Sequence, residues 1–179
     1  MDIKYVVKIT SRAWALPILN ALHVGTPGRQ AALLTATGAS RTAFLQSLDH
    51  LLEMGLLERN PGHGHPLRPE FRLTPDGVVA AKMAHEIMGI VKKDELDVLR
   101  LSWTVPVLSA LHTPHPFGEI KRRLPPITDR ALSQSLQCLE QRHWIYRHID
   151  EATRPPRPLY AAINTGAVIS RITRSVLTG

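Results

Sequence analysis

Hydrophobic residues at helical spacing mark the first predicted helix, near the start of the chain. The apolar positions that share one helix face are Trp14, Ile18, Leu19 and Leu22. This spacing predicts a helix that stops before Gly25, because apolar residues three or four positions apart lie on one side of a helix. Residues 27–38 predict a short second helix, and Gly38 closes a turn after it.

A longer amphipathic helix is predicted after that turn. Ser40 is placed to cap it, because a serine hydroxyl accepts a hydrogen bond from a free backbone N–H of the first turn. The apolar residues that follow at i, i+4 and i+7 are Phe44, Leu48 and Leu51. A helix, a short helix, a tight turn and an amphipathic helix in this order predict a helix-turn-helix.

Two short strands and a closing helix complete the pattern. The segments "GLLERN" (55–60) and "EFRLT" (70–74) predict strands, and the stretch 61–69 between them is too rich in Gly and Pro for regular structure. Residues 75–91 predict the closing helix. Three helices followed by a β-hairpin, the wing, indicate a winged helix-turn-helix.

The first half of the chain is echoed in the second half. The segment "WALPILNAL" at 14–22 returns as "WTVPVLSAL" at 103–111, an offset of 89 positions. The segment "LQSLDHL" at 45–51 returns as "SQSLQCL" at 133–139, an offset of 88. Further blocks follow in the same order, so chance is a poor explanation. We therefore expect two homologous domains.

The second repeat predicts the same elements as the first. Thr128 takes the capping place of Ser40, strands are predicted on both sides of the loop 150–158, and residues 164–177 predict a closing helix. The predicted fold class is mainly α with small β-hairpin wings (α+β), in two tandem winged helix-turn-helix domains. Their expected boundaries are 1–91 and 92–179.

The charge balance favours an anionic partner. The chain carries 22 Lys and Arg against 15 Asp and Glu, a formal net charge of +7, and the second half is the more basic. A basic protein favours a polyanion such as nucleic acid, or an anionic membrane surface. No apolar run approaches the ~20 residues of a membrane span, so we expect no membrane partner.

Several classes of site are not supported by the sequence. Cys138 is the single cysteine, which excludes an internal disulfide and a cysteine-rich zinc site and fits a reducing compartment. The histidine pairs at 63/65 and 112/115 lack further ligands at usual zinc spacing, so we expect no metal. No catalytic motif, cofactor loop or signal-peptide core is visible. We expect a cytoplasmic protein that is not an enzyme and has no cofactor.

The second half resembles a known family. The segments "FGEIKRRLPPITDRALSQSLQCLEQRHWIYRHI" and "RPPRPLY" resemble the HxlR-type branch of the MarR-like bacterial transcription regulators, and "SRTAFLQSLDHLLEMGLLERN" is similar to MarR-like domains generally. The resemblance implies a winged helix-turn-helix that binds DNA. Such regulators usually carry one domain and dimerise, whereas this chain has two domains fused.

The outer faces of the two amphipathic helices are the first candidate sites. In a helix-turn-helix, the first turns of the recognition helix enter the major groove and contact base edges. Arg41 and Gln46 suit bidentate contacts to guanine and adenine. The candidate residues on both helices are Ser40, Arg41, Thr42, Gln46, Thr128, Arg130, Ser133, Gln134 and Gln137. The alternative is that they form an ordinary solvated helix face.

The wings and one basic helix are the second candidate sites. Cations at an exposed loop tip add little stability, so they suit phosphate contacts or insertion into the minor groove. The wing candidates are Arg59, His63, His65, Arg68 and Arg72 in the first half, and Arg147, His148, Arg154 and Arg157 in the second. The candidates for DNA backbone contacts are Lys121, Arg122 and Arg123.

These features favour a double-stranded-DNA-binding transcriptional regulator that acts as an intramolecular pseudo-dimer at the nucleoid. Each closing helix carries an apolar stripe, which we expect to pack on the other stripe or on the first helices. The stripe of the first closing helix comprises Val79, Met83, Ile87 and Val91, and that of the second comprises Val168, Ile172 and Val176. The alternatives are a structural or adaptor protein of chromosome organisation that uses tandem winged helices for protein contacts, or a replication initiator. The sequence does not determine whether the chain forms homo-oligomers or binds a small-molecule effector. For Cys138 the alternatives are a passive residue and a thiol sensor.

Overall fold

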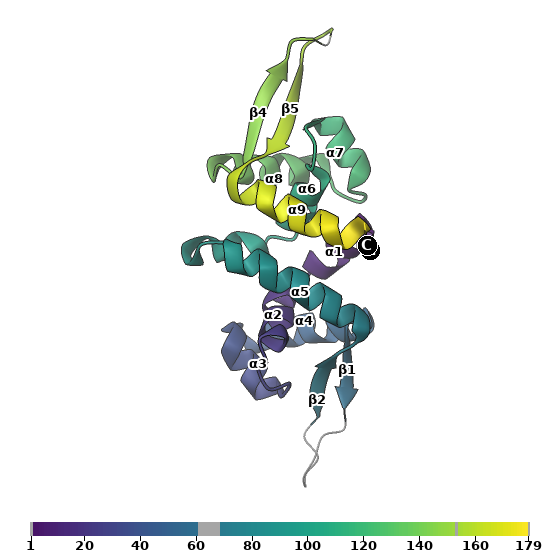
Figure 1. The fold of residues 1–179 in the computed structure, drawn as a ribbon, viewed down its shortest axis with the longest axis vertical. Helices are drawn as coiled ribbons and strands as arrows, with labels where there is room; N and C mark the ends of the chain where they lie inside the picture. Colours follow the sequence, from purple (N-terminus) through teal and green to yellow (C-terminus); the bar gives the residue numbers. More distant parts are fainter. Residues whose placement is uncertain (1, 61–68, 153, 179) are drawn as a thin grey trace. The chain divides into compact units, whose positions relative to one another are not determined.

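Figure 1 shows the fold in a computed structural model, which describes residues 2–60, 69–152 and 154–178. Internal contacts divide the chain into two compact units. The first unit comprises residues 12–96, and the second unit comprises residues 97–179 together with 1–11. The described residues are mainly helical with short antiparallel strands, which confirms the predicted fold class at this level.

The first unit combines helices with a two-stranded hairpin. Its elements are α2 (Ala15–His23), α3 (Gln30–Thr37), α4 (Arg41–Glu53), β1 (Leu57–Asn60), β2 (Glu70–Leu73) and α5 (Pro75–Ile90). Helix α2 packs along α5 and also contacts α3 and α4, so the core of this unit lies among these helices. The order of elements is the one that the sequence predicts.

Helix α4 begins and packs as its sequence predicts. The Oγ of Ser40 accepts a hydrogen bond from the backbone N–H of Ala43 at 3.4 Å and caps the helix. The side chains of Phe44, Leu48 and Leu51 are buried. The turn before α4 requires Gly38, whose φ of 67° lies in the left-handed region that favours glycine.

The β1–β2 hairpin buries one face at its base. Its antiparallel register pairs Leu57 with Leu73 and Arg59 with Phe71. The side chains of Leu57 and Phe71 are buried, because successive residues of a strand face opposite sides of the hairpin. The candidate residues of the hairpin tip, His63, His65 and Arg68, lie outside the described residues.

The second unit has the same order of helices and hairpin, with three additions. Its elements are α1 (Ile3–Thr10), the end of the 3₁₀ helix η1 (Lys93–Arg100), α6 (Thr104–Ala110), β3 (His115–Pro116), α7 (Phe117–Arg123), α8 (Asp129–Gln141), β4 (Ile145–Asp150), β5 (Arg157–Ala162) and α9 (Asn164–Thr178). Strand β5 lies between β3 and β4, and both pairings are antiparallel. Helix α9 packs against α6 (Figure 1).

Helix α1 belongs to the second unit, which differs from the expected domain boundary of 1–91. Its buried residues Val6, Ile9 and Thr10 lie on one side, and the helix packs against α6. The Oγ1 of Thr10 donates a hydrogen bond to the carbonyl oxygen of Ser102 at 2.8 Å. The apolar face of α1 is therefore buried by residues more than ninety positions away, which the local pattern does not reveal.

Helix α8 repeats the construction of α4. The Oγ1 of Thr128 accepts a hydrogen bond from the backbone N–H of Ala131 at 3.1 Å, which confirms the predicted cap. Below the exposed face of this helix, the buried side chains are Leu132, Leu136 and Leu139. Trp144, which follows the helix, is also fully buried and supports the start of β4.

The closing helices α5 and α9 pack closely against the backbone just before the first strand of each hairpin. A Cβ atom on Gly77 would overlap the carbonyl oxygen of Leu56, and a Cβ atom on Gly166 would overlap the carbonyl oxygen of Trp144. Glycine is therefore required in the first turn of both helices. Of the stripe predicted for the first closing helix, Met83 and Ile87 in α5 and Val91 just after it are buried, whereas Val79 is 45% exposed. The stripe predicted for α9, which comprises Val168, Ile172 and Val176, is half-buried.

Candidate nucleic-acid interface

Both candidate recognition helices present their predicted polar residues to solvent. On the first unit these exposed residues are Ser40, Arg41, Thr42 and Gln46. On the second unit they are Thr128, Arg130, Ser133, Gln134 and Gln137. The burial of every third or fourth apolar residue fixes this exposure. Each helix therefore offers a polar surface at its N-terminal turns, where a helix-turn-helix meets base edges.

The hydroxyls of Ser40 and Thr128 already have a structural role. Each accepts a hydrogen bond from a backbone N–H of its own helix, so the cap fixes where the recognition face begins. Arg41 and Arg130 follow directly after the caps. Neither arginine forms an ion pair with any residue that the structure describes, so both guanidinium groups are available to a ligand.

The basic residues of α7 form ion pairs with nearby carboxylates. Arg122 and Arg123 both form ion pairs with Glu119, and the Arg123 Nε lies 3.0 Å from Glu119 Oε1. The hydrogen bond from Arg123, together with the charge of Arg122, lowers the pKa of the Glu119 carboxyl. The Nζ of Lys121 lies 2.7 Å from Asp129 Oδ1. Contacts of these three cations with DNA phosphates would compete with these ion pairs.

His115 on β3 lies near the charges of Arg123 and Glu119 on α7. Its partial burial and the positive charge of Arg123 lower the pKa of the imidazole below its ordinary value. The Oγ1 of Thr113 is within hydrogen-bond distance of His115 Nε2, at 3.0 Å. The neutral form of His115 is therefore favoured beside α7.

The described part of the first wing is only partly cationic. The guanidinium carbon of Arg59 lies 5.6 Å from the centre of the Phe71 ring, which is a cation–π distance. Arg72 lies 3.9 Å from Glu70, and Glu70 also forms an ion pair with Arg29 at 3.4 Å. Of this wing's described arginines, Arg59 is therefore the one without a carboxylate partner among the described residues.

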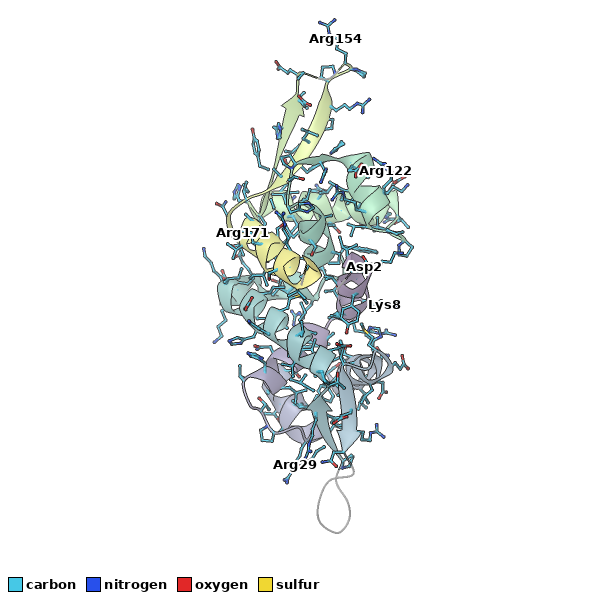
Figure 2. The ribbon with its side chains drawn as sticks, turned by 45° about the vertical axis from the view of Figure 1, so that its right-hand side comes forward. Asp2, Lys8, Arg29, Arg122, Arg154 and Arg171 are labelled. Atoms are coloured by element: carbon cyan, nitrogen blue, oxygen red, sulfur yellow. The ribbon has the colours of Figure 1, made fainter. Side chains whose placement is uncertain are left out.

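The second wing carries cations that form no ion pair with the described residues. Arg147, Arg154 and Arg157 are exposed and form no ion pair with a residue that the structure describes. Arg154 lies at the tip of the β4–β5 hairpin (Figure 2). His148 is half-buried, and its ring is parallel to that of Tyr146, with 5.8 Å between the ring centres. The described part of this hairpin therefore carries three exposed arginines that form no ion pair with a described residue.

Two residues of the second wing were missed by the sequence analysis. Tyr146 is 56% exposed and Ile149 is 50% exposed, both on β4. The sequence analysis predicts a strand before the loop 150–158 and names Arg147 and His148 there, but not the large side chains next to them. Period-two spacing places Tyr146 on the side of His148 and Ile149 on the side of Arg147, so no single apolar face marks these two residues in the sequence.

Neither a membrane span nor a metal cluster is found where the structure describes the chain. None of the helices there is long and apolar enough to cross a membrane. Nor does the described part bring three or more His, Cys, Asp or Glu side chains together in a way that could hold a metal ion.

One comparison with known proteins matches the second unit. Residues 98–177 match the family model described as HxlR-like helix-turn-helix, which confirms the resemblance predicted for the second half. Among curated proteins, none matches the chain significantly. A solved structure from Porphyromonas gingivalis W83, described as a transcriptional regulator of the MarR family, is 21% identical, with a TM-score of 0.42. That alignment covers 48% of this chain and 84% of the other, and so weak a likeness does not establish a shared fold.

Proposed function

We propose that this protein is a sequence-specific double-stranded-DNA-binding transcriptional regulator. The main support is the HxlR-like helix-turn-helix match of residues 98–177, combined with the exposed polar face of α8. In this proposal the first turns of α8 enter the major groove, and Arg130, Ser133 and Gln134 contact base edges. The unpaired arginines of the β4–β5 hairpin contact phosphates or the adjacent minor groove.

The first unit contributes a second, weaker interface in this proposal. Arg41 and Gln46 of α4 read bases, and Arg59 contacts the backbone beside them. Because Arg72 already pairs with Glu70, it adds less to the affinity. The two recognition helices differ in their exposed residues, so the operator has two unequal half-sites. The chain acts as an intramolecular pseudo-dimer, with half-sites about one helical turn, ~34 Å, apart.

The cations of α7 have a lesser role in this proposal. Lys121, Arg122 and Arg123 each have a carboxylate partner, so a phosphate must displace an existing ion pair. We therefore assign affinity first to Arg147, Arg154 and Arg157. Removing these three should change DNA binding more than removing any other three exposed cations.

A salt titration of DNA binding tests the proposal. Each phosphate neutralised contributes about −0.9 to the slope of log K against log salt concentration. We expect the triple substitution Arg147→Gln, Arg154→Gln and Arg157→Gln to reduce the magnitude of this slope by roughly 2.7. A matched control with the same loss of charge, Lys4→Gln, Lys92→Gln and Lys93→Gln, should keep the slope. A slope near zero for the unmodified protein rejects DNA binding.

The exposed apolar residues of the wing favour the alternative function of an adaptor. Tyr146 is 56% exposed and Ile149 is 50% exposed, on opposite sides of β4, so each side of the wing offers one large apolar side chain to a protein partner. Selection of bound genomic fragments at two salt concentrations separates the two functions. Specific fragments retained at the higher concentration support a regulator, whereas no enrichment at either concentration supports the adaptor.

A further inference from the structure

The two candidate recognition helices begin with opposite charges at the same position. In α4, Arg41 directly follows the capping residue Ser40. In α8, Asp129 directly follows the capping residue Thr128. Both of these first helical residues are exposed. A helix-turn-helix contacts base edges with the first turns of its recognition helix, so the charge is reversed where the proposed function places each helix in the major groove.

Asp129 also differs from Arg41 in its surroundings. The Nζ of Lys121, on α7, lies 2.7 Å from the Asp129 Oδ1. The corresponding short helix of the first unit, α3 with the sequence QAALLTAT, contains no charged residue. Among the described residues, Arg41 therefore has no ion-pair partner, whereas the charge of Asp129 is offset by a lysine.

The ion pair leaves Asp129 able to accept a further hydrogen bond. A carboxylate has two oxygens with about four acceptor positions, and one lysine does not occupy all of them. The side chain of Asp129 is 68% exposed, so a ligand can reach it. The charge of Lys121 also reduces the repulsion between this carboxylate and DNA phosphates. Asp129 can therefore approach DNA although it is acidic.

The major-groove edges of the four bases respond differently to a carboxylate. Guanine presents the acceptors N7 and O6, thymine presents the acceptor O4, and adenine has the acceptor N7 beside its N6 donor. Cytosine presents its N4 amino donor without an acceptor beside it. Because a carboxylate only accepts hydrogen bonds, it suits cytosine and is repelled by guanine. An arginine at the same position only donates, so it suits guanine.

We propose that Asp129 is a specificity-determining residue that selects cytosine in the half-site contacted by the second unit. Its carboxylate accepts a hydrogen bond from the cytosine N4 and keeps its ion pair with Lys121. Arg41 selects guanine at the corresponding position of the other half-site. An operator with different bases at these two positions is therefore bound more tightly than one with two identical half-sites. This inference rests on the proposed DNA-binding function.

A purely structural role of Asp129 leads to a different result. A carboxylate in the first turn of a helix stabilises that helix, because it lies at the positive end of the helix dipole. Loss of this contribution changes the affinity for every DNA sequence by the same factor. Loss of a base contact changes the affinity for one base at one position, so base preference separates the two roles.

Selection of bound duplexes from a randomised library, with the full chain, tests the proposal. We expect the operator selected by the unmodified protein to contain a cytosine that Asp129→Ala no longer requires and that Asp129→Arg replaces with guanine. Glu140→Ala is the matched control, because it removes the same charge from an exposed residue in the last turn of α8. This control should select the same bases as the unmodified protein.

A single modified base tests the hydrogen bond itself. Pyrimidin-2-one has the cytosine ring without the N4 amino group. In place of the selected cytosine, it should weaken binding by the unmodified protein about tenfold, since a hydrogen bond to a charged group is lost. The affinity of Asp129→Ala should not change. Thermal unfolding of each variant shows that it is folded.

Three outcomes overturn the inference and leave the proposed function standing. The first is that Asp129→Ala selects the same bases as the unmodified protein, and the second is that it loses affinity equally for all sequences. The third is that the position altered in Asp129→Ala prefers a base other than cytosine. If the unmodified protein selects no sequence at all, both the proposed function and this inference are wrong.

Discussion

At the scale of single residues, two hydroxyls on α9 make opposite contributions to stability. The Ser170 Oγ is buried and has no hydrogen-bond partner among the described residues, so replacing the hydroxyl with a hydrogen removes a desolvation penalty. We expect Ser170→Ala to raise the free energy of unfolding of the second unit by about 1 kcal/mol. Urea denaturation followed by amide signals of this unit measures the change.

Thr173 provides the control on the same helix. Its Oγ1 donates to the carbonyl oxygen of Ile169 at 3.1 Å, so Thr173→Val removes a hydrogen bond that is already formed. We expect this variant to lose about 1 kcal/mol in the same denaturation experiment. A similar loss for Ser170→Ala would show that the Ser170 hydroxyl has a partner in solution.

The exposed arginines should divide into two groups by their effect on sequence preference. Arg41 and Arg130 are placed to contact base edges, and each good bidentate contact discriminates by about 1–3 kcal/mol. We expect Arg41→Ala and Arg130→Ala to relax base preference at one or two operator positions. Arg157→Ala should weaken binding to all sequences alike, because phosphates carry no sequence. Binding to a randomised operator library compares the base preferences of the three variants. If all three lost affinity equally for every sequence, the assignment of Arg41 and Arg130 to base contacts would be wrong.

The sequence predicted the exposure of the candidate residues but not the state of their charges. Helical spacing alone indicates which side of α8 is apolar, so the exposure of Arg130 and Gln134 follows from Leu132 and Leu136. The ion pair between Lys121 and Asp129 joins two different helices, and no local pattern contains it. The orphan hydroxyl of Ser170 was equally invisible, because it depends on what surrounds the helix in three dimensions.

At the scale of elements, the placement of α5 depends on the size of one residue. A side chain at Gly77 would overlap the carbonyl oxygen of Leu56, whereas a Cβ atom on Gly89, in the same helix, would meet nothing within 4 Å. We expect Gly77→Ala to destabilise the first unit by about 1–3 kcal/mol, since backbone must move. Gly89→Ala should stabilise it by about 0.5–1 kcal/mol, because alanine is the better helix former. Thermal unfolding of both variants tests this difference in sign.

Most elements were predictable because their signals are local. The caps at Ser40 and Thr128 and the apolar spacing behind them locate α4 and α8 to within a residue or two. Strand β3 was not predictable, because it consists of His115 and Pro116 alone and exists through pairing with Tyr160 and Leu159 of β5. Such long-range pairing has no signature in a short stretch of sequence.

At the scale of the whole molecule, α1 stabilises a unit whose remaining residues begin at position 97. Ile9 is fully buried, so Ile9→Ala should cost the second unit about 2–5 kcal/mol. Residues 12–96 should keep their stability. Amide hydrogen exchange measures the stability of both units separately. The control is Lys4→Ala on the exposed side of α1, which should leave the stability of both units unchanged. Loss of protection confined to residues 12–96 would contradict the assignment of α1 to the second unit.

The discontinuous second unit has a consequence for the order of folding during synthesis. Helix α1 leaves the ribosome before the first unit, but its partner α6 follows only after the whole first unit has been made. The first unit is contiguous in the chain and can fold as soon as it emerges. Until residue 110 is translated, the apolar side of α1, with Val6 and Ile9, has no native partner. A nascent chain halted between residues 97 and 103 would therefore expose this helix to chaperones and proteases, although its first unit is complete.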